Sequence, residues 1–100
     1  MSALSISQQD GQFRLAGTLD FSSVAELLAT DPGWPANAEI HIDLADVRHS
    51  NSAGLALLLE WMQMAQQKGR QIKYHNVPEQ LLVIARAYGV ENDLPVASAI

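Results

Sequence analysis

The sequence predicts an α/β fold with the element order ββαβαβα, in which a four-stranded mixed sheet carries helices mainly on one face. Near the N-terminus, apolar and polar residues alternate in two short runs, which is the pattern of half-buried strands. After Asp20 the apolar period changes to that of a helix, and short apolar strands then alternate with helices. A chain of 100 residues accommodates one domain, which we place over residues 1–100.

The first two predicted strands form a hairpin. Leu4 and Ile6 alternate with serines, and apolar residues alternate in the same way from Phe13 to Leu19. Asp10-Gly11 lies between the two runs, and these residue types tolerate the positive φ values of a tight hairpin turn. The first two strands are therefore expected to pair in antiparallel fashion.

A helix is predicted after Asp20 and a third strand over about residues 39–45. Ser23 and Glu26 have the spacing of a capping box, and residues 31–35 are rich in Pro, Gly and Asp, so we expect a loop there. In the third strand, apolar residues alternate with polar ones. The apolar face of the helix consists of Val24, Leu27 and Leu28.

The longest predicted helix covers about residues 52–68. A short loop, residues 46–51, leads into it, and Gly69 follows as a C-terminal stop. Ile72 and Tyr74 then mark a fourth strand. The order of these elements favours parallel strands joined by crossover helices.

A third helix is predicted to begin at Pro78, where the missing N–H of proline costs nothing. Gly89 closes this helix, and the tail from Val90 shows no strong pattern. Its predicted buried face consists of Leu81, Ile84, Ala85 and Tyr88.

The composition excludes several classes of protein. Eleven acidic residues against six basic ones give a formal net charge of −5, and no basic stripe is present, which argues against nucleic-acid binding. No cysteine is present for disulfides, thiolate metal sites or thiol nucleophiles. The densest apolar run, residues 53–59, is far shorter than the roughly 20 residues of a membrane span, so no membrane insertion is expected. Charged residues make up 17% of the chain, below the usual quarter or so, which suggests that part of the surface is covered by a partner.

The long helix carries two apolar stripes instead of one. The first stripe has the spacing of a core-facing helix surface, and a polar strip separates it from the second. Because Trp and Met are enriched at protein interfaces, the second stripe is either a docking surface or a surface covered by a neighbouring helix. The first stripe contains Leu55, Leu58, Leu59 and Met62, and the second contains Leu57, Trp61 and Met64.

The start of this helix carries the most informative motif. Residues 42–47 read Ile-Asp-Leu-Ala-Asp-Val, and residues 50–59 read Ser-Asn-Ser-Ala-Gly-Leu-Ala-Leu-Leu-Leu. Asn51 is a good N-cap residue, which places Ser52 at the first helical position. The partly positive helix end would tolerate a phosphate on the Ser52 hydroxyl, and that phosphate would repel or reshape a docked partner.

These two segments resemble the STAS domain family, which contains anti-sigma-factor antagonists and modules of sulfate transporters. The element order, the proline-initiated last helix and the Leu94-Pro95 pair fit the family over the whole chain. Within the family, the sequence is most similar to the stand-alone, MlaB-type STAS subunits of Mla phospholipid ABC transporters. The resemblance implies the STAS fold.

The MlaB-like resemblance also implies a non-enzymatic, cytoplasmic subunit that acts by protein–protein interaction. Such a subunit binds and stabilises or activates the ATPase of an Mla-type ABC transporter. It would thereby support phospholipid transport and outer-membrane lipid asymmetry, from a position peripheral to the inner membrane. The residues expected to bind the partner are Asn51, Ser52, Ala53, Leu57, Trp61 and Met64.

The resemblance also implies an alternative function, that of an anti-sigma-factor antagonist in a partner-switching pathway. In that branch of the family, the serine matching Ser52 is phosphorylated by a partner's kinase. Three positions depart from the family pattern, because Ser50, Asn51 and Ala53 replace an aliphatic residue, an aspartate and a hydroxyl residue. These departures weaken the phosphorylation hypothesis more than the docking hypothesis.

Residues that suggest catalysis or metal binding form no complete set. His41, Asp43 and His75 would form a two-histidine, one-carboxylate site if their strands adjoin, but solvated residues on an open sheet face explain them better. His49 is close to Ser52 in sequence, but the pair lacks an orienting acid and an oxyanion hole. No glycine-rich phosphate loop is present. We therefore expect no metal, no cofactor and no enzymatic activity.

Overall fold

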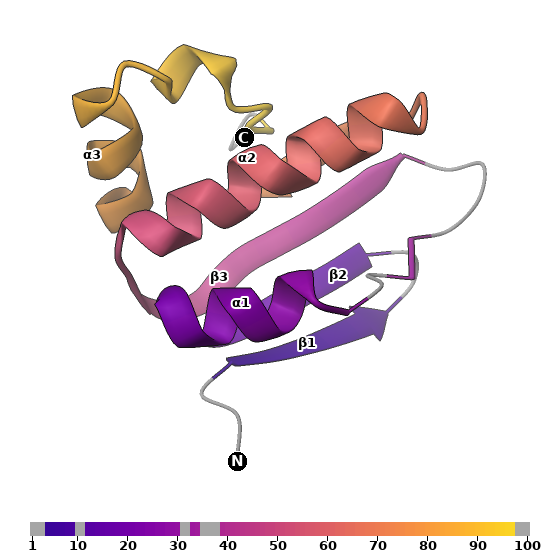
Figure 1. Cartoon of the computed structure of the whole chain (residues 1–100), viewed down its shortest axis with the longest axis horizontal. Coiled ribbons are helices and arrows are strands. Elements are labelled where there is room, and N and C mark those ends of the chain that lie inside the picture. Colours follow the sequence, from indigo (N-terminus) through magenta and orange to yellow (C-terminus); the bar gives the residue numbers. More distant parts are fainter. Residues whose placement is uncertain (1–3, 10–11, 31–32, 35–38, 98–100) are drawn as a thin grey trace.

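The computed structural model, which describes residues 4–9, 12–30, 33–34 and 39–97, contains a four-stranded sheet in the order β1-β2-β3-β4 (Figure 1). β1 and β2 are antiparallel, and β2, β3 and β4 run parallel to one another. The predicted hairpin and mixed sheet are therefore confirmed, although Asp10-Gly11 lies outside the described residues. The strands are β1 (Leu4–Gln9), β2 (Gln12–Leu19), β3 (Ile40–Ser50) and β4 (Ile72–His75).

Three α-helices follow the strands in the predicted order, and α1 and α2 lie across the same face of the sheet (Figure 1). The order ββαβαβα is confirmed, with one further turn of 3₁₀ helix near the C-terminus. The helices are α1 (Phe21–Leu28), α2 (Ser52–Gln67), α3 (Glu79–Ala87) and the 3₁₀ helix η1 (Glu91–Asp93).

The hydrophobic core lies between the sheet and α2. Tyr74 of β4 is fully buried, and its hydroxyl donates a 2.6 Å hydrogen bond to the backbone oxygen of Leu58 in α2. Burial raises the pKa of the Tyr74 hydroxyl, so the group stays protonated and remains a donor. The tail completes this region, because Val96 forms a parallel bridge with Tyr74 and Leu94 is buried. The prediction of a tail without pattern missed this contact with β4.

β3 is longer than predicted. It continues to Ser50, so residues 46–50 are strand and not loop. Two register shifts against β2 each place one extra residue in β3, between Asp43 and Asp46 and between Val47 and His49. Such bulges break the alternation of buried and exposed residues, which is the signal that defines a strand in the sequence.

α1 begins directly after Asp20, as predicted, but its capping box is different. Asp20 is the N-cap: its carboxylate accepts a 2.9 Å hydrogen bond from the Ser23 backbone, and the Ser23 hydroxyl accepts one of 3.0 Å from the Asp20 backbone. The backbone N–H of Ser23 lowers the pKa of Asp20 through this contact. The predicted pairing of Ser23 with Glu26 is therefore wrong, because Ser23 already closes the box one turn earlier.

Smaller corrections concern the ends and faces of the helices. Pro78 is the N-cap of α3 and not its first helical residue, and Lys68 is the C-cap of α2. The predicted glycine stops are confirmed, because Gly69 and Gly89 have φ values of 66° and 73°. Two residues on the predicted apolar faces are exposed, since each lies at the C-terminal end of its helix. These are Leu28 and Tyr88.

Candidate partner-binding site

α1, α2 and α3 all begin at the edge of the sheet where β2, β3 and β4 end (Figure 1). The end of β2 is joined to the start of α2, because the backbone N–H of Asn51 donates a 3.1 Å hydrogen bond to the Leu19 carbonyl. α3 joins the same edge, because the Gln80 side chain accepts a 3.1 Å hydrogen bond from the Ser50 backbone. Hydrogen bonds to β2 and to α3 therefore hold the motif segment in place at Ser50 and Asn51.

The start of α2 has the predicted geometry. The side chain of Asn51 accepts a 2.8 Å hydrogen bond from the backbone N–H of Ala53, so Asn51 is the N-cap and Ser52 is the first helical residue. The Ser52 side chain is half-buried at this helix end, where unsatisfied N–H groups create a partly positive potential. The structure thus presents one hydroxyl at a rigid, mildly electropositive position.

Gly54 allows the first turn of α2 to approach its neighbours closely. A Cβ atom at this position would overlap the Ser50 hydroxyl oxygen and would lie 3.1 Å from Cδ2 of Leu81 and 3.3 Å from Cβ of Leu19. β2, β3 and α3 therefore all pack closely against α2 at Gly54, which has no side chain. This close packing sets the position of Ser52, two residues earlier in the chain.

The prediction that the second stripe of α2 is an exposed docking surface is wrong. The relative exposure of Leu57 is 0% and that of Trp61 is 1%, and Ala53 is also buried. Met64 is half-buried against the core. Of the six residues expected to bind a partner, only Asn51 and Ser52 present side chains at the helix start.

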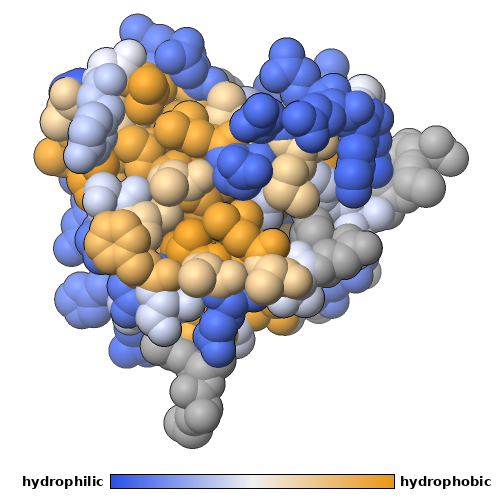
Figure 2. Space-filling model, viewed as in Figure 1, coloured by the Kyte–Doolittle hydropathy of each residue, from blue (hydrophilic) through white to orange (hydrophobic). Residues whose placement is uncertain are grey.

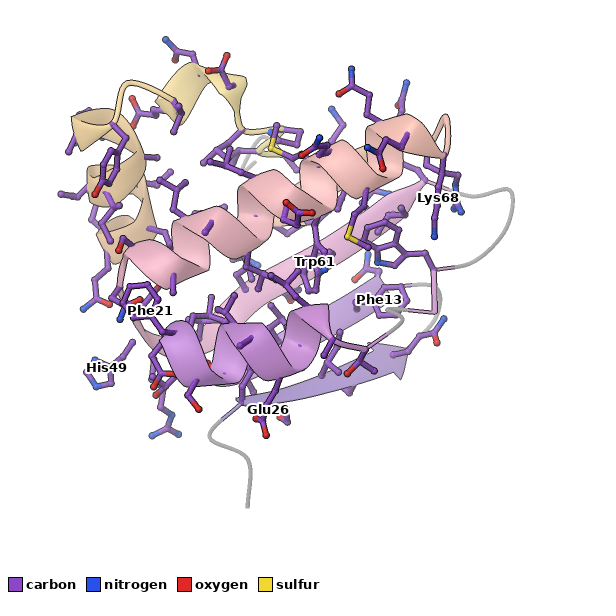
Figure 3. All side chains as sticks on the ribbon, in the orientation of Figure 1. Phe13, Phe21, Glu26, His49, Trp61 and Lys68 are labelled. Carbon is purple, nitrogen blue, oxygen red and sulfur yellow. The ribbon has the colours of Figure 1, made fainter. Side chains whose placement is uncertain are left out.

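The two stripes of α2 are parts of one broad apolar arc. Gly54 and Ala65 lie between the two stripes, on the buried side of the helix. Because these residues are small, the sequence shows a gap between two apolar stripes where the helix surface is continuously buried. The Trp61 ring points from α2 toward α1 (Figure 3) and packs edge-to-face against Trp34, with ring centroids 6.2 Å apart. Nζ of Lys68 lies 5.8 Å from the centroid of the Trp34 ring. The alternative prediction, that the second stripe is covered within the chain, is confirmed for Trp61, but the ring that packs against it belongs to Trp34, outside the helices, and not to a neighbouring helix.

Phe21 is the exposed aromatic residue that the sequence interpretation missed. Its relative exposure is 70%, and its side chain lies at the start of α1, on the same side of the molecule as His49 (Figure 3). Figure 2 shows that apolar residues gather on this helix face toward the end where α1 and α2 begin, whereas hydrophilic residues cover the opposite end of α2. The available signal was an aromatic residue directly after the Asp20 cap, at the first position of α1.

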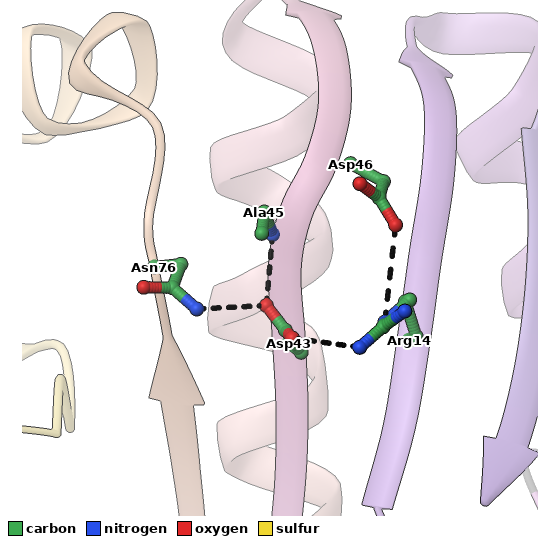
Figure 4. Close-up of polar contacts among 5 residues, drawn as sticks. All are labelled: Arg14, Asp43, Ala45, Asp46 and Asn76. Carbon is green, nitrogen blue, oxygen red and sulfur yellow. Dashed lines mark hydrogen bonds and ion pairs between the residues drawn. The ribbon is translucent and has the colours of Figure 1, made fainter.

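The opposite face of the sheet carries a polar network centred on Asp43 (Figure 4). One oxygen of Asp43 accepts hydrogen bonds from the Ala45 backbone, at 2.9 Å, and from the Asn76 side chain, at 3.1 Å. Arg14 lies 3.7 Å from Asp43 and 3.8 Å from Asp46. Burial by itself raises the pKa of the Asp43 carboxyl, but the hydrogen bonds and the Arg14 charge outweigh it, so this pKa lies below its usual value.

This network predicts a specific acid sensitivity. A carboxyl with a lowered folded-state pKa stabilises the folded chain above its unfolded-state pKa, and this stabilisation disappears as the pH falls through the folded-state pKa. We therefore expect the loss of unfolding free energy below about pH 4 to be shallower for Asp43→Asn than for the wild type, as measured by urea titration. Equal slopes for Asp43→Asn and the wild type would contradict this assignment.

The described residues contain no group of three or more His, Asp or Glu side chains arranged to hold a metal ion. His49, close to Ser52 in sequence, is exposed at the end of β3. None of the helices in the described part of the chain is long and apolar enough to cross a bilayer. The features that stand out at the helix starts are therefore one hydroxyl and one exposed aromatic ring.

Comparison with known proteins agrees with this architecture. Residues 2–96 match a family model described as the Mlab STAS domain. The chain belongs to the STAS domain family. This STAS domain also superposes on the unphosphorylated form of the anti-sigma factor antagonist SpoIIAA with a TM-score of 0.71 and 17% sequence identity. The superposition covers 98% of this chain and 89% of SpoIIAA, so the two proteins share a fold. Among curated proteins, none matches the chain.

STAS domains are generally regulatory interaction domains and not enzymes, and they act through protein–protein contacts. Membership in the family is consistent both with an Mla transporter subunit and with an anti-sigma-factor antagonist. The choice between these two functions depends on the identity of the partner.

Proposed function

We propose that this STAS domain binds the ATPase subunit of an Mla-type phospholipid ABC transporter and stabilises or activates it. The family model that matches the chain is named after MlaB, which supports this branch of the family. In this role the domain works in the cytoplasm, is held at the inner membrane through its partner, and supports outer-membrane lipid asymmetry.

The observation that carries the proposal is the exposed Phe21 ring at the same edge as the half-buried Ser52 hydroxyl. Aromatic side chains that fill a pocket on the partner supply much of the energy of a protein interface, and the polar groups around them set the register. The rigid connections of Asn51 and Ser50 to β2 and α3 hold this surface in one conformation, so little entropy is lost on binding.

Binding alone is sufficient for the proposed effect on the ATPase. A subunit that binds the assembled ATPase more tightly than the dissociated or unfolded form shifts the population toward the assembled form by mass action. The net charge of −5 favours approach to a basic patch on the partner and speeds the encounter. No chemical step on this chain is required.

Alanine substitution at Phe21 tests the surface. We expect Phe21→Ala to lower the affinity for the Mla-type ATPase of the same organism at least about tenfold in calorimetric titration, because the anchoring ring is lost. Tyr88→Ala is a matched control. Tyr88 is similarly exposed, at 67%, but lies at the C-terminal end of α3 and not at a helix start. Wild-type affinity of Phe21→Ala, or equal losses in both variants, would contradict docking at the helix starts.

The second candidate function is that of an anti-sigma-factor antagonist. It is favoured by the position of Ser52 at an accessible helix start and by the fold shared with SpoIIAA. This function predicts a mass increase of one phosphate, mapped to Ser52, in protein isolated from its native host. An unmodified Ser52 under all growth conditions, together with binding to the ATPase, would favour the transporter subunit.

A further inference from the structure

Two histidines are in hydrogen-bond contact on the sheet face opposite the helices. Nδ1 of His41, in β3, lies 2.7 Å from Nε2 of His75, in β4, and the ring centroids are 5.0 Å apart. The other nitrogen of His41, Nε2, lies 3.1 Å from a carboxylate oxygen of Glu39. Both rings are half-buried, and the surface proposed for the partner uses neither of them.

The hydrogens on the facing nitrogens determine which protonation states the His41–His75 contact allows. A carboxylate can only accept, so Nε2 of His41 donates to Glu39. A contact of 2.7 Å between two ring nitrogens holds one hydrogen, because one nitrogen donates and the other accepts. The remaining nitrogen, Nδ1 of His75, can take up a proton without disturbing the contact. One further proton would place hydrogens on both facing nitrogens and put two positive charges side by side.

We propose that His41 and His75 form a proton-sensitive clamp between β3 and β4, which holds with at most one positive charge and opens when both rings are charged. The neighbouring charges support this behaviour, since the carboxylates favour a first positive charge and the cations oppose a second. Residues 94–97, along the other edge of β4, carry no ionisable side chain. The charged groups around the pair are Glu39, which directly precedes β3, Asp43 and Asp46 from β3, Arg14 from β2 and Lys73 from β4.

Opening the clamp would loosen a short element. β4 has four residues, and its far edge is held by backbone contacts of Tyr74 with the tail. Because the contact cannot form with hydrogens on both facing nitrogens, the intact folded pair holds at most one extra proton, whereas two independent rings in the unfolded chain can each take one up. The unfolded state therefore binds more protons in acid, and stability falls as the pH falls, by up to about tenfold in the folding equilibrium constant per pH unit.

A double-mutant cycle measures the clamp directly. Urea unfolding of the wild type, His41→Gln, His75→Gln and the double variant would be compared at about pH 8 and about pH 5. We expect a favourable coupling of about three- to tenfold in the folding equilibrium constant at the higher pH and a smaller one at the lower pH. His49→Gln, which removes an exposed histidine from the end of β3, should keep the wild-type pH dependence. A coupling that is absent at the higher pH, or equal at both, would overturn the proposal.

Nitrogen NMR of the imidazole rings in the wild type tests the same proposal without any substitution. We expect the rings of His41 and His75 to take up protons in two separated steps, with the amides of β4 losing exchange protection at the second step. Independent, single-step titration of His41 and His75 would overturn the clamp even if a variant fails to fold.

Discussion

Trp61→Ala is expected to lower the free energy of unfolding by about 3 to 5 kcal/mol, because it removes a large side chain from a site that is 1% exposed. The substitution also removes the edge-to-face partner of Trp34. A domain of this size is stable by only about 5 to 15 kcal/mol, so the variant would be unfolded in part at growth temperature. Urea unfolding followed by far-UV circular dichroism measures the loss.

Two comparisons separate this core role from a role in docking. Gln63→Ala, on the exposed side of the same helix, should change the unfolding free energy by less than about 0.5 kcal/mol. Trp61→Phe should keep most of the packing, and the folded variant should bind the ATPase with wild-type affinity. A loss below about 1 kcal/mol for Trp61→Ala would contradict the placement of this ring in the core.

Ser52→Glu is expected to lower the affinity for the ATPase about 100-fold or more, because it places an unpaired charge at the centre of the proposed interface. The fold should tolerate this change. A carboxylate in the first turn of a helix interacts favourably with the partly positive helix end, so the unfolding free energy should be unchanged or slightly higher. Calorimetric titration with the ATPase and urea unfolding of the free domain measure the two effects separately.

The control for Ser52→Glu carries the same charge change at the other end of the helix. Gln67 is exposed and lies 15 residues further along α2, about 22 Å away along the helix axis. Gln67→Glu should bind the ATPase with nearly wild-type affinity, because a rim charge affects mainly the association rate. Equal losses for both variants would indicate long-range repulsion and contradict a contact at Ser52.

Local patterns in the sequence were sufficient to predict the fold. The two alternating runs predicted the β1–β2 hairpin, and the change of period after Asp20 predicted the first crossover helix. These patterns involve residues close together in the chain, so they can be recognised without knowledge of the tertiary structure. The N-cap at Asn51 was predictable for the same reason, since capping is a contact between adjacent residues.

The features that were missed depend on contacts between distant segments. The end of β3 was placed too early because its bulges are set by pairing with β2, which no local pattern reveals. Trp61 packs against Trp34, which is distant in the sequence, and periodicity along α2 alone could not distinguish a covered stripe from a docking surface. The Asp20–Ser23 capping box, by contrast, is a local contact, and it was missed because Ser23 and Glu26 have the spacing of a competing box.

The sequence also suggested a covered surface, because only 17% of the residues are charged. Part of this shortage is explained within the chain, since the second stripe of α2 is buried by neighbouring elements. What remains is the apolar helix face near the starts of α1 and α2 (Figure 2). The surface proposed for the partner is therefore smaller than the sequence suggested, and it is displaced from the middle of α2 to its beginning.

Photocrosslinking from position 21 tests the central claim most directly. A photoreactive phenylalanine analogue placed at position 21 preserves the aromatic ring, and an analogue at position 88 is the control. The proposed surface predicts a covalent adduct with the Mla-type ATPase from position 21 and none from position 88. If the domain binds the ATPase but position 21 forms no adduct with it, the partner does not dock at the helix starts.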